Sequence, residues 1–494
     1  SKNMNDLNQT DTSWSTLPSL IIVEILSYLS LKDRLNAVST CKRWRSCFWH
    51  PSLWTNLVFR LKNGSRSRSK YLAERCGRFV KTATVEFNST SVWDVREFAK
   101  MLEILADNRN LEKLSIQPTS CHIEWPERDG SRVLVHQLCC VRNIYRFCGS
   151  KTTSFPFRKL VHYLSYFTMT EAIIKNCRKL KHLSLGCSED LMANADYLLS
   201  ELAIHHSNSL ETLHLSTVKE DPESYGLLDL PVDMFQSFPH LTVLGIDYDY
   251  LTNSLLEIFV TKKTAQLEKL VIHVHGIEPD HEKIRNETWQ CLVRYSPKLE
   301  VTLNLIHSVD GVTCLLDILR PSMPLAHFRS FFCSHINMAA IDFMAGHNSA
   351  TLKSVHIVDG IMNMQPNIYE SASDEDSFVM LAWKCPNLQH FTLLGYDVTD
   401  DDVVAIVRLR GSQLKTFVVP HCCISSLDEE DGSIWQSFGN VDQAFYDEVS
   451  KNLGRSWRPV EDHKLHPAIK HMHADAETAK KKTLVYQHMT PGFE

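Results

Sequence analysis

The sequence predicts an α/β fold in which a short all-helical segment precedes a long stack of strand–helix repeats. Two observations support this prediction. Apolar residues between 13 and 59 recur at helical spacing in three short blocks. From about residue 79 to 424, the pattern L-x-x-L-x-L returns every 26 to 36 residues or so, an interval typical of repeats that stack into a solenoid. The length of 494 residues also exceeds what one compact core usually serves.

Composition excludes several classes of function. Hydrophobic residues make up 44% of the chain and charged residues 22%, as in ordinary globular proteins, and the formal net charge is -6. This charge gives no general attraction to nucleic acid or to an anionic membrane. The aliphatic run Leu20 to Val23 ends at Glu24 and is far shorter than the roughly 20 apolar residues that span a bilayer. We therefore expect neither a membrane nor a direct nucleic-acid partner.

The N-terminus and the cysteines indicate a cellular compartment. Residues 1–12 are polar, contain no apolar signal core and are expected to be disordered. The 15 cysteines are scattered and form no C-x-x-C pair, so we expect them to be reduced and to behave as small buried hydrophobes. Together these features favour a cytoplasmic and/or nuclear location.

Residues 13–59 are expected to form three short helices. Ser15 or Thr16 is predicted to cap the first, with Pro18 in its first turn. Asp33 is predicted to open the second, and Thr40 to Cys47 to form the third. The apolar residues of the first helix recur at helical spacing: Ile21, Ile22, Ile25, Leu26 and Leu29.

A basic segment follows at residues 60–78. It is predicted to be a solvated linker that is flexible from Gly64 to Ser69 and leads into a helix. The alternative for the basic run Arg66 to Lys70 is a nuclear-import or phosphate-binding patch.

The repeats occupy residues 79–424. In each, the last two apolar positions lie two residues apart and so point to one face of a short strand, and an amphipathic helix precedes the strand. One such unit cannot close a core, whereas stacked units bury a continuous one. We predict a leucine-rich-repeat horseshoe with parallel strands on the concave side and helices on the convex side. Clear copies begin at Leu111, Leu180, Leu210, Leu241, Leu267, Leu352, Leu388 and Leu414, and weaker ones lie near Val80, Leu299 and Leu325.

Several segments interrupt or end the repeats. Inserted loops are expected at residues 117–130 and, with acidic composition, at Asn363 to Ser377. Residues 425–462 are predicted to hold a loop, Ser425 to Ser433, and a capping helix, Val441 to Leu453, closed by Gly454. Residues 463–494 have no sustained apolar face and are predicted to be a loosely ordered tail.

No catalytic motif is present, so we predict a non-enzymatic protein with no catalytic residue, no cofactor and no metal. Two histidine clusters are the nearest approach to a metal site, but 24 histidines produce such clusters by chance. The acidic run Asp397 to Val403 is better explained as the start of a helix, where carboxylates accept from free N–H groups. The clusters are His273, His275 and His281, and His463, His466, His471 and His473.

The first segment resembles the F-box, the motif that docks on the adaptor Skp1 in cullin-RING ubiquitin ligases. The matching features are the Leu17-Pro18 start, an I-x-x-x-I-L-x-x-L helix, Asp33 with Leu35, Val38 with Cys41-Lys42 and Trp44, and a closing Leu53-Trp54. One departure is that Leu20 stands where an acidic residue is usual. Segments from about Leu315 to Val419 also resemble F-box proteins with leucine-rich repeats.

The resemblance implies a substrate-recognition subunit of a Skp1–cullin–F-box (SCF) E3 ubiquitin ligase. Its partners would be Skp1, through it cullin-1 and a RING subunit, and an unidentified protein substrate destined for ubiquitination and proteasomal degradation. The alternative is a leucine-rich-repeat scaffold that acts outside a ligase. The implied Skp1-binding residues are Leu17, Pro18, Ile21, Ile22, Ile25, Leu26, Leu29, Leu31, Leu35, Val38 and Trp44, of which some must instead hold the three helices together.

The concave strands are predicted to carry the substrate. The leucines of each strand should face the core beneath the helices, so the residues that alternate with them should face the concave surface. The mixed character of these residues argues against a nucleic-acid ligand and against a strongly charged peptide signal. Plain solvent exposure of these residues and contact through the Asn363 to Ser377 loop are the alternatives. The candidate residues are Lys113, His182, His214, Lys269, His356 and His390.

Overall fold

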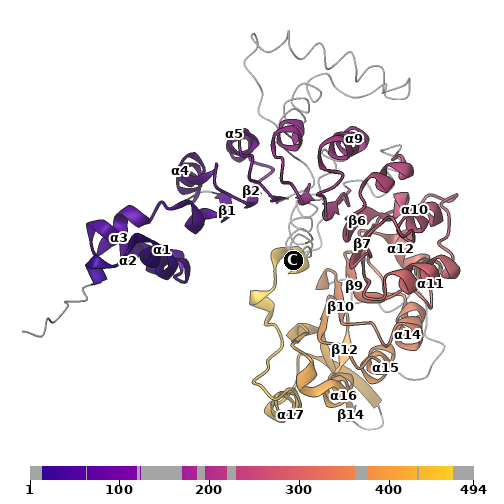
Figure 1. Ribbon diagram of the computed structural model, residues 1–494. Helices are drawn as coiled ribbons and strands as arrows, with labels where there is room; N and C mark the ends of the chain where they lie inside the picture. The colour runs from indigo at the N-terminus through magenta and orange to yellow at the C-terminus, as the bar shows by residue number, and fades with distance from the viewer. Residues whose placement is uncertain are drawn as a thin grey trace, which may run out of the picture.

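A computed structural model describes residues 14–62, 64–119, 123, 170–185, 195–219, 230–361, 376–430, 433–470 and 485. Within these ranges the chain forms a curved array with strands on the inside and helices on the outside (Figure 1). Three short helices lie at one end of the curve and α17 (Gln443–Leu453) lies at the other. No helix in the described ranges is both long enough and apolar enough to cross a membrane.

The N-terminal segment consists of α1 (Ser19–Ser27), α2 (Leu31–Ser39) and α3 (Lys42–Cys47). The predicted cap of α1 is wrong, because Ser15 and Thr16 lie in a separate 3-10 turn, Trp14–Thr16, and Pro18 is the N-cap residue. The second helix starts two residues before Asp33, since the Ser30 Oγ accepts the Asp33 N–H at 3.2 Å.

One parallel sheet dominates the described residues. Its twelve strands follow one another in chain order, and each neighbouring pair is parallel. The predicted α/β solenoid with strands inside and helices outside is thereby confirmed. The strands are β1 (Asn56–Leu61), β2 (Thr82–Phe87), β3 (Lys113–Pro118), β4 (His182–Ser184), β5 (Thr212–His214), β6 (Val243–Asp247), β7 (Lys269–Val274), β8 (Glu300–Ile306), β9 (Leu325–Phe331), β10 (Ser354–Val358), β11 (His390–Leu394) and β13 (Thr416–Val418).

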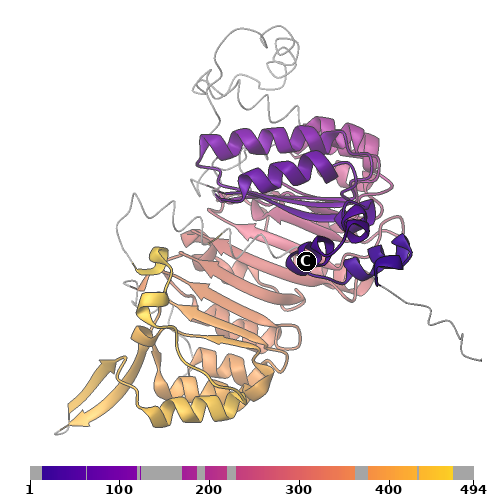
Figure 2. The ribbon, with the colours of Figure 1, turned by 90° about the vertical axis from the view of Figure 1, so that its left-hand side faces the viewer.

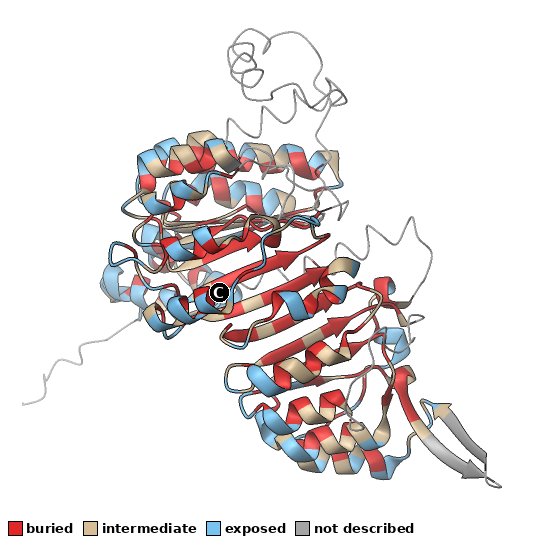
Figure 3. Ribbon diagram, turned by 90° about the vertical axis from the view of Figure 1, so that its right-hand side faces the viewer, coloured by how far each residue is buried: buried red, intermediate tan, exposed pale blue. Residues whose placement is uncertain are grey.

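The helices cover the convex face and bury the leucine positions of the repeats. Leu114 lies opposite Leu183 on the next strand, and both are buried. Phe87 of β2 stacks on Phe98 of the following helix with ring centroids 4.0 Å apart. Figure 3 shows the buried residues as a band along the sheet. The helices are α4 (Arg66–Cys76), α5 (Val92–Ala106), α9 (Ala195–His206), α10 (Asn253–Ile258), α11 (Asn286–Tyr295), α12 (Val309–Thr313), α13 (Leu315–Ile318), α14 (Met338–His347), α15 (Ser377–Lys384) and α16 (Asp400–Arg410).

The basic run at Arg66 to Lys70 is part of α4, so the prediction of a flexible linker through Ser69 is wrong. Arg66 forms an ion pair with the buried Asp94 of α5, and the Ser69 Oγ donates to the Arg60 carbonyl at 2.9 Å. These contacts hold the first turns of α4 against the start of the sheet.

A second, three-stranded sheet closes the far end of the repeats. It joins β12 (Val398–Thr399) to β14 (Ile424–Glu430) and β15 (Ser433–Phe438). The last two strands form an antiparallel hairpin that projects from the body of the molecule (Figure 2), so the prediction of a loop at Ser425 to Ser433 is wrong. Gly454, with φ of +69°, ends α17 in the left-handed conformation.

The chain then returns along the inner side of the curve (Figure 1). The Trp457 Nε1 donates to the Phe417 carbonyl at 2.8 Å, and a short helix, α18 (Pro467–Lys470), follows. Leu465 and Ile469 are buried. The prediction of a loosely ordered tail is therefore wrong for residues 463–470 and for Val485, which is also buried; residues 471–484 and 486–494 lie outside the described ranges.

Candidate protein-docking surfaces

The first helix has two distinct faces. Ile22, Val23 and Leu26 point into the core of the three-helix segment and are buried. The opposite face is open and presents large apolar side chains around Glu24, because Leu20 is 74% exposed and Ile21 is 48% exposed. Large apolar side chains that gather on one exposed face are typical of an interaction surface.

The structure divides the residues that the sequence implied for Skp1 binding. Four of them belong to the segment's own core and offer no surface to a partner in this structure: Ile22, Leu26, Val38 and Trp44. Leu17, Ile25, Leu29 and Leu31 are half-buried against that core. Pro18, Ile21 and Leu35 are exposed.

Leu20 and Tyr28, at the two ends of α1, are also exposed but were not among the residues assigned from the sequence. At 100° per residue, Ile21 lies 100° and the C-cap residue Tyr28 lies 80° from Leu20 on the helical wheel, so all three share one face. The helical phase of α1 could have identified them, because the buried residues Ile22 and Leu26 define the opposite face.

Hydrogen bonds to main-chain carbonyls hold this helical segment together. The Arg34 guanidinium donates to the carbonyls of Leu26 and Leu53, each at 3.0 Å. The Trp54 Nε1 donates to the Phe48 carbonyl at 2.7 Å. Such charge-assisted and buried hydrogen bonds fix the exposed face of α1 and α2 in one orientation before any partner binds.

The concave surface of the sheet is built from rows of residues on successive strands. One row runs from Lys113 through His182, Thr212 and Val243 to Lys269. Its predicted contact residues Lys113, His182 and Lys269 are half-buried, as are His356 and His390 further along the sheet. The topology therefore places these five on the concave side, as predicted from their spacing.

Charges along the starts of the strands pair between neighbouring repeats. Lys181 and Glu211 are 3.1 Å apart, and Lys81 and Glu112 are 3.5 Å apart. Further along the sheet, Glu300 at the start of β8 forms an ion pair with Lys353, which precedes β10. Exposed pairs of this kind add little stability, but they leave no stripe of one sign. The rim is thus locally neutral, which agrees with the mixed character inferred from the sequence.

His214 differs from the other predicted contact residues because it is only 2% exposed. Its assignment to the substrate surface is wrong for this conformation, since no partner atom can reach it. It lies 3.4 Å from the Ser184 Oγ and packs edge-on against His273, with ring centroids 5.8 Å apart.

The segment that follows β5 covers this part of the sheet. The Thr217 N–H and Oγ1 donate to the two carboxylate oxygens of Asp247 at 2.7 and 2.5 Å. The Thr217 carbonyl lies 2.7 Å from the His273 Nδ1. Lys219, which is itself buried, forms an ion pair with Asp249. The segment after β5 thus crosses β6 and reaches β7.

Burial in this network shifts the pKa values of its ionisable groups. Burial raises the pKa of Asp247 to about 7, although hydrogen bonds from Thr217 oppose the shift. Burial lowers the pKa of His273 to about 4 and holds that of His275 well below its ordinary value. These histidines are consequently neutral near neutral pH, and the His275 Nε2 accepts the Lys219 N–H at 3.2 Å.

The histidine clusters noted in the sequence are engaged by protein groups. The His281 Nε2 lies 2.7 Å from the Tyr248 carbonyl, and His273 and His275 belong to the buried network described above. Across the parts of the chain that the structure describes, no three His, Cys, Asp or Glu side chains are arranged to hold a metal ion; His471 and His473 lie outside those parts. Asp400, Asp401 and Asp402 occupy the first turn of α16, with Thr399 as its cap.

An apolar row runs along the carboxyl ends of four strands: Ile306, Phe331, Val358 and Leu394. The chain itself covers this row. Val218 packs on it from one side, and Leu465, Ala468 and Ile469 pack on it from the C-terminal segment, together with Val485. The carboxyl ends of β8 to β11 are therefore covered on the concave side, whereas none of the described residues packs in this way on β3 and β4.

Comparison with known proteins identifies the class of the N-terminal segment. Residues 14–60 match the family model described as F-box-like, so the chain carries an F-box-like domain at the α1–α3 end. The predicted F-box is confirmed over this range.

The rest of the chain also has relatives. F-box only protein 33 from Homo sapiens is 27% identical over 495 residues, which cover 91% of this chain and 83% of that protein. F-box/LRR-repeat protein 21 from Ovis aries is 23% identical over 449 residues, with coverage of 90% and 89%. Among solved structures, a chain of the yeast Rad7 and Elc1 complex covers 84% of this chain and 89% of its own length, with a TM-score of 0.40 and 13% identity. The protein is thus similar over most of its length to F-box and leucine-rich-repeat proteins.

Proposed function

We propose that this protein is the substrate-recognition subunit of a Skp1–cullin–F-box ubiquitin ligase. The observation that carries the proposal is the F-box-like domain at residues 14–60, whose first helix presents an open apolar face through Leu20 and Ile21. The relatives named F-box only protein 33 and F-box/LRR-repeat protein 21 support it, because they resemble the chain through both the domain and the repeats.

In this proposal two surfaces of the protein bind two different partners. The F-box-like domain docks on Skp1, which links it to cullin-1 and a RING subunit. The curved sheet holds a protein substrate, and the chain itself performs no chemistry. Its contribution is proximity and orientation, since it brings a substrate lysine near the ubiquitin-charged enzyme. With this role we propose a location in the cytoplasm and/or the nucleus.

Among the described residues, the first strands are the part of the concave surface best suited to a substrate, because the covering segment packs on the later strands. Lys113 and His182 lie there and are half-buried, so they can contact a partner without rearrangement of the sheet. His356 and His390 lie on later strands, near the apolar row that the C-terminal segment covers. We therefore assign substrate contact first to β3 and β4.

Co-expression tests the proposal directly. The chain should co-purify with Skp1 and cullin-1, and the reconstituted complex should transfer ubiquitin to a partner captured through the repeats. A chain that binds partners through its repeats but recruits neither Skp1 nor cullin-1 would instead be a scaffold that acts outside a ligase, and the proposal would be wrong.

A further inference from the structure

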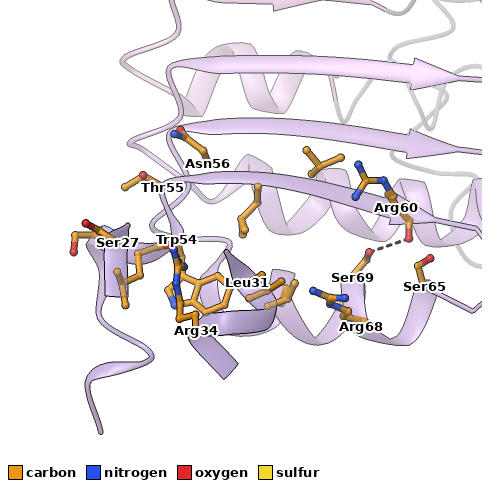
Figure 4. Close-up of a pocket in the computed structure, with 15 residues that line it drawn as sticks. Ser27, Leu31, Arg34, Trp54, Thr55, Asn56, Arg60, Ser65, Arg68 and Ser69 are labelled. Carbon is orange, nitrogen blue, oxygen red and sulfur yellow. Dashed lines mark hydrogen bonds between the residues drawn. The ribbon is translucent and has the colours of Figure 1, made fainter. Parts of the chain in front are cut away.

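A groove of about 480 Å³ lies where the F-box-like domain meets the first strand of the sheet. Three elements enclose it (Figure 4): the F-box-like helices with Leu31 and Arg34, the strand β1, and the first turns of α4 with Ser65 and Arg68. We call it the β1 groove. It is separate from the exposed apolar residues of α1 and from the covered carboxyl ends of β8 to β11.

One wall of the β1 groove is the free edge of the sheet. Strand β1 has β2 on one side and no strand on the other among the described residues. The Thr55 carbonyl accepts from the N–H groups of Lys81 and Thr82 beside β2. Because residues of a parallel strand bond alternately to its two sides, the main-chain groups of Asn56, Val58 and Arg60 face the groove.

Part of this edge is already occupied and part is open. The Arg60 carbonyl accepts from the Ser69 Oγ of α4 at 2.9 Å, which closes one end of the groove. Within the described ranges, no main-chain hydrogen bond from another segment reaches Asn56 or Val58 on this side. Val58 also has a side chain that is 43% exposed. An open strand edge of this kind is a template for another strand.

The lining of the groove is positively charged. It contains Arg34, Arg60 and Arg68 and no aspartate or glutamate. The Arg34 guanidinium is held by main-chain carbonyls and lies over the Trp54 ring at 5.7 Å, so its charge has no carboxylate partner there. Arg60 pairs with Glu86 at 3.2 Å, whereas Arg68 is exposed and makes no ion pair with the described residues.

We propose that the β1 groove binds an extended acidic peptide segment of a partner protein, which adds a strand to the free edge of β1. Main-chain hydrogen bonds to Asn56 and Val58 supply the affinity that does not depend on side chains. Carboxylates of the peptide meet Arg34 and Arg68, and charge complementarity selects acidic sequences. The proposal goes beyond the ligase role and does not require it, because the groove is formed by this chain alone.

The test selects short random peptides from a display library on the immobilised full-length chain. We expect the selected peptides to be rich in aspartate and glutamate and poor in proline, because proline cannot donate to a strand. Their binding should protect the N–H groups of Asn56 and Val58 from hydrogen exchange. Arg68→Glu should weaken the binding of these peptides by about tenfold or more.

The matched control is Lys70→Glu, which makes the same charge change on the same helix at an exposed residue that does not line the groove. It should leave affinity within about twofold of the wild type.

A second variant, Val58→Pro, removes one main-chain donor from the free edge and should also weaken binding, with an unchanged unfolding midpoint as evidence that the chain is folded. The proposal is overturned if no selected peptide depends on Arg68, or if bound peptide leaves Asn56 and Val58 unprotected.

Discussion

Arg34 of α2 donates a hydrogen bond through Nη1 to the Leu53 carbonyl, 3.0 Å away, and so ties the second helix of the F-box-like domain to the turn that leads into the sheet. The same guanidinium donates to the Leu26 carbonyl of α1. One side chain thereby fixes the relative positions of α1, α2 and the start of β1. The apolar docking face and the repeats depend on this junction for their mutual orientation.

Replacing Arg34 should destabilise the domain. Arg34→Met keeps the aliphatic stem but removes the guanidinium donor from the carbonyls of Leu26 and Leu53, of which Leu26 still accepts from the Leu29 N–H, so the free energy of unfolding should fall by about 2 to 3 kcal/mol. Urea unfolding followed by tryptophan fluorescence, to which Trp54 contributes, measures the change. Lys32→Met, at an exposed position of the same helix, serves as the control. Equal stability of the two variants would show that Arg34 does not hold the junction together.

The C-terminal segment should leave the concave surface when a charge is placed in its buried face. Ile469 is 2% exposed and packs on the apolar row that contains Phe331. Ile469→Asp should therefore weaken the attachment of residues 455–470 by about 3 kcal/mol and make them sensitive to limited proteolysis. Ser456→Asp puts the same charge at an exposed position of the segment and should change nothing. Undiminished protection in the Ile469 variant would contradict the packing described above.

The buried network around Asp247 should make stability depend on pH. Its pKa is about 7 in the folded protein against 3.8 in an unfolded chain, because burial disfavours the ionised carboxylate. The folded state therefore binds this proton more tightly. The favourable contribution is fully present below about pH 4 and is lost as the pH rises toward 7.

Comparison with Asp247→Asn isolates this group from the histidines nearby. The asparagine cannot ionise, and its amide can still accept from the Thr217 N–H through Oδ1 and donate to the Thr217 Oγ1 through Nδ2. The free energy of unfolding of the wild type relative to this variant should fall by roughly 4 kcal/mol between about pH 4 and pH 7. Asp280→Asn, at an exposed position, should show no such trend. A constant difference between wild type and Asp247→Asn would mean that Asp247 is already ionised at low pH.

The repeats could be predicted from the sequence because the spacing of their leucines encodes both the strand and its buried face. Leu114 and Leu183, assigned from the pattern alone, lie opposite each other and are buried. The weak copies near Leu299 and Leu325 also form strands, β8 and β9, although one residue is out of register between them. The local sequence pattern was sufficient to predict the strands and their buried faces wherever each repeat contacts only its neighbouring repeats.

The closure of the concave surface could not be predicted in this way. Thr217 meets His273 across 56 residues of sequence, and Ile469 meets Phe331 across a still longer interval. No periodicity connects such segments, so His214 looked like an open contact residue. In the F-box-like domain the apolar residues were found, but their division between core and surface required the helical phase of α1, which separates Ile21 from Ile22.

The most direct test of the account is the affinity of the purified chain for Skp1. Ile21 and Leu35 are each 48% exposed on the F-box-like domain and are not part of its buried core. The double variant Ile21→Asp with Leu35→Asp should bind Skp1 at least about 100-fold more weakly, with an unchanged unfolding midpoint. Ile204→Asp, on the exposed side of α9, is the control and should bind as the wild type does. Wild-type affinity in the double variant, or no binding by the wild type itself, would contradict the proposed docking of this domain on Skp1.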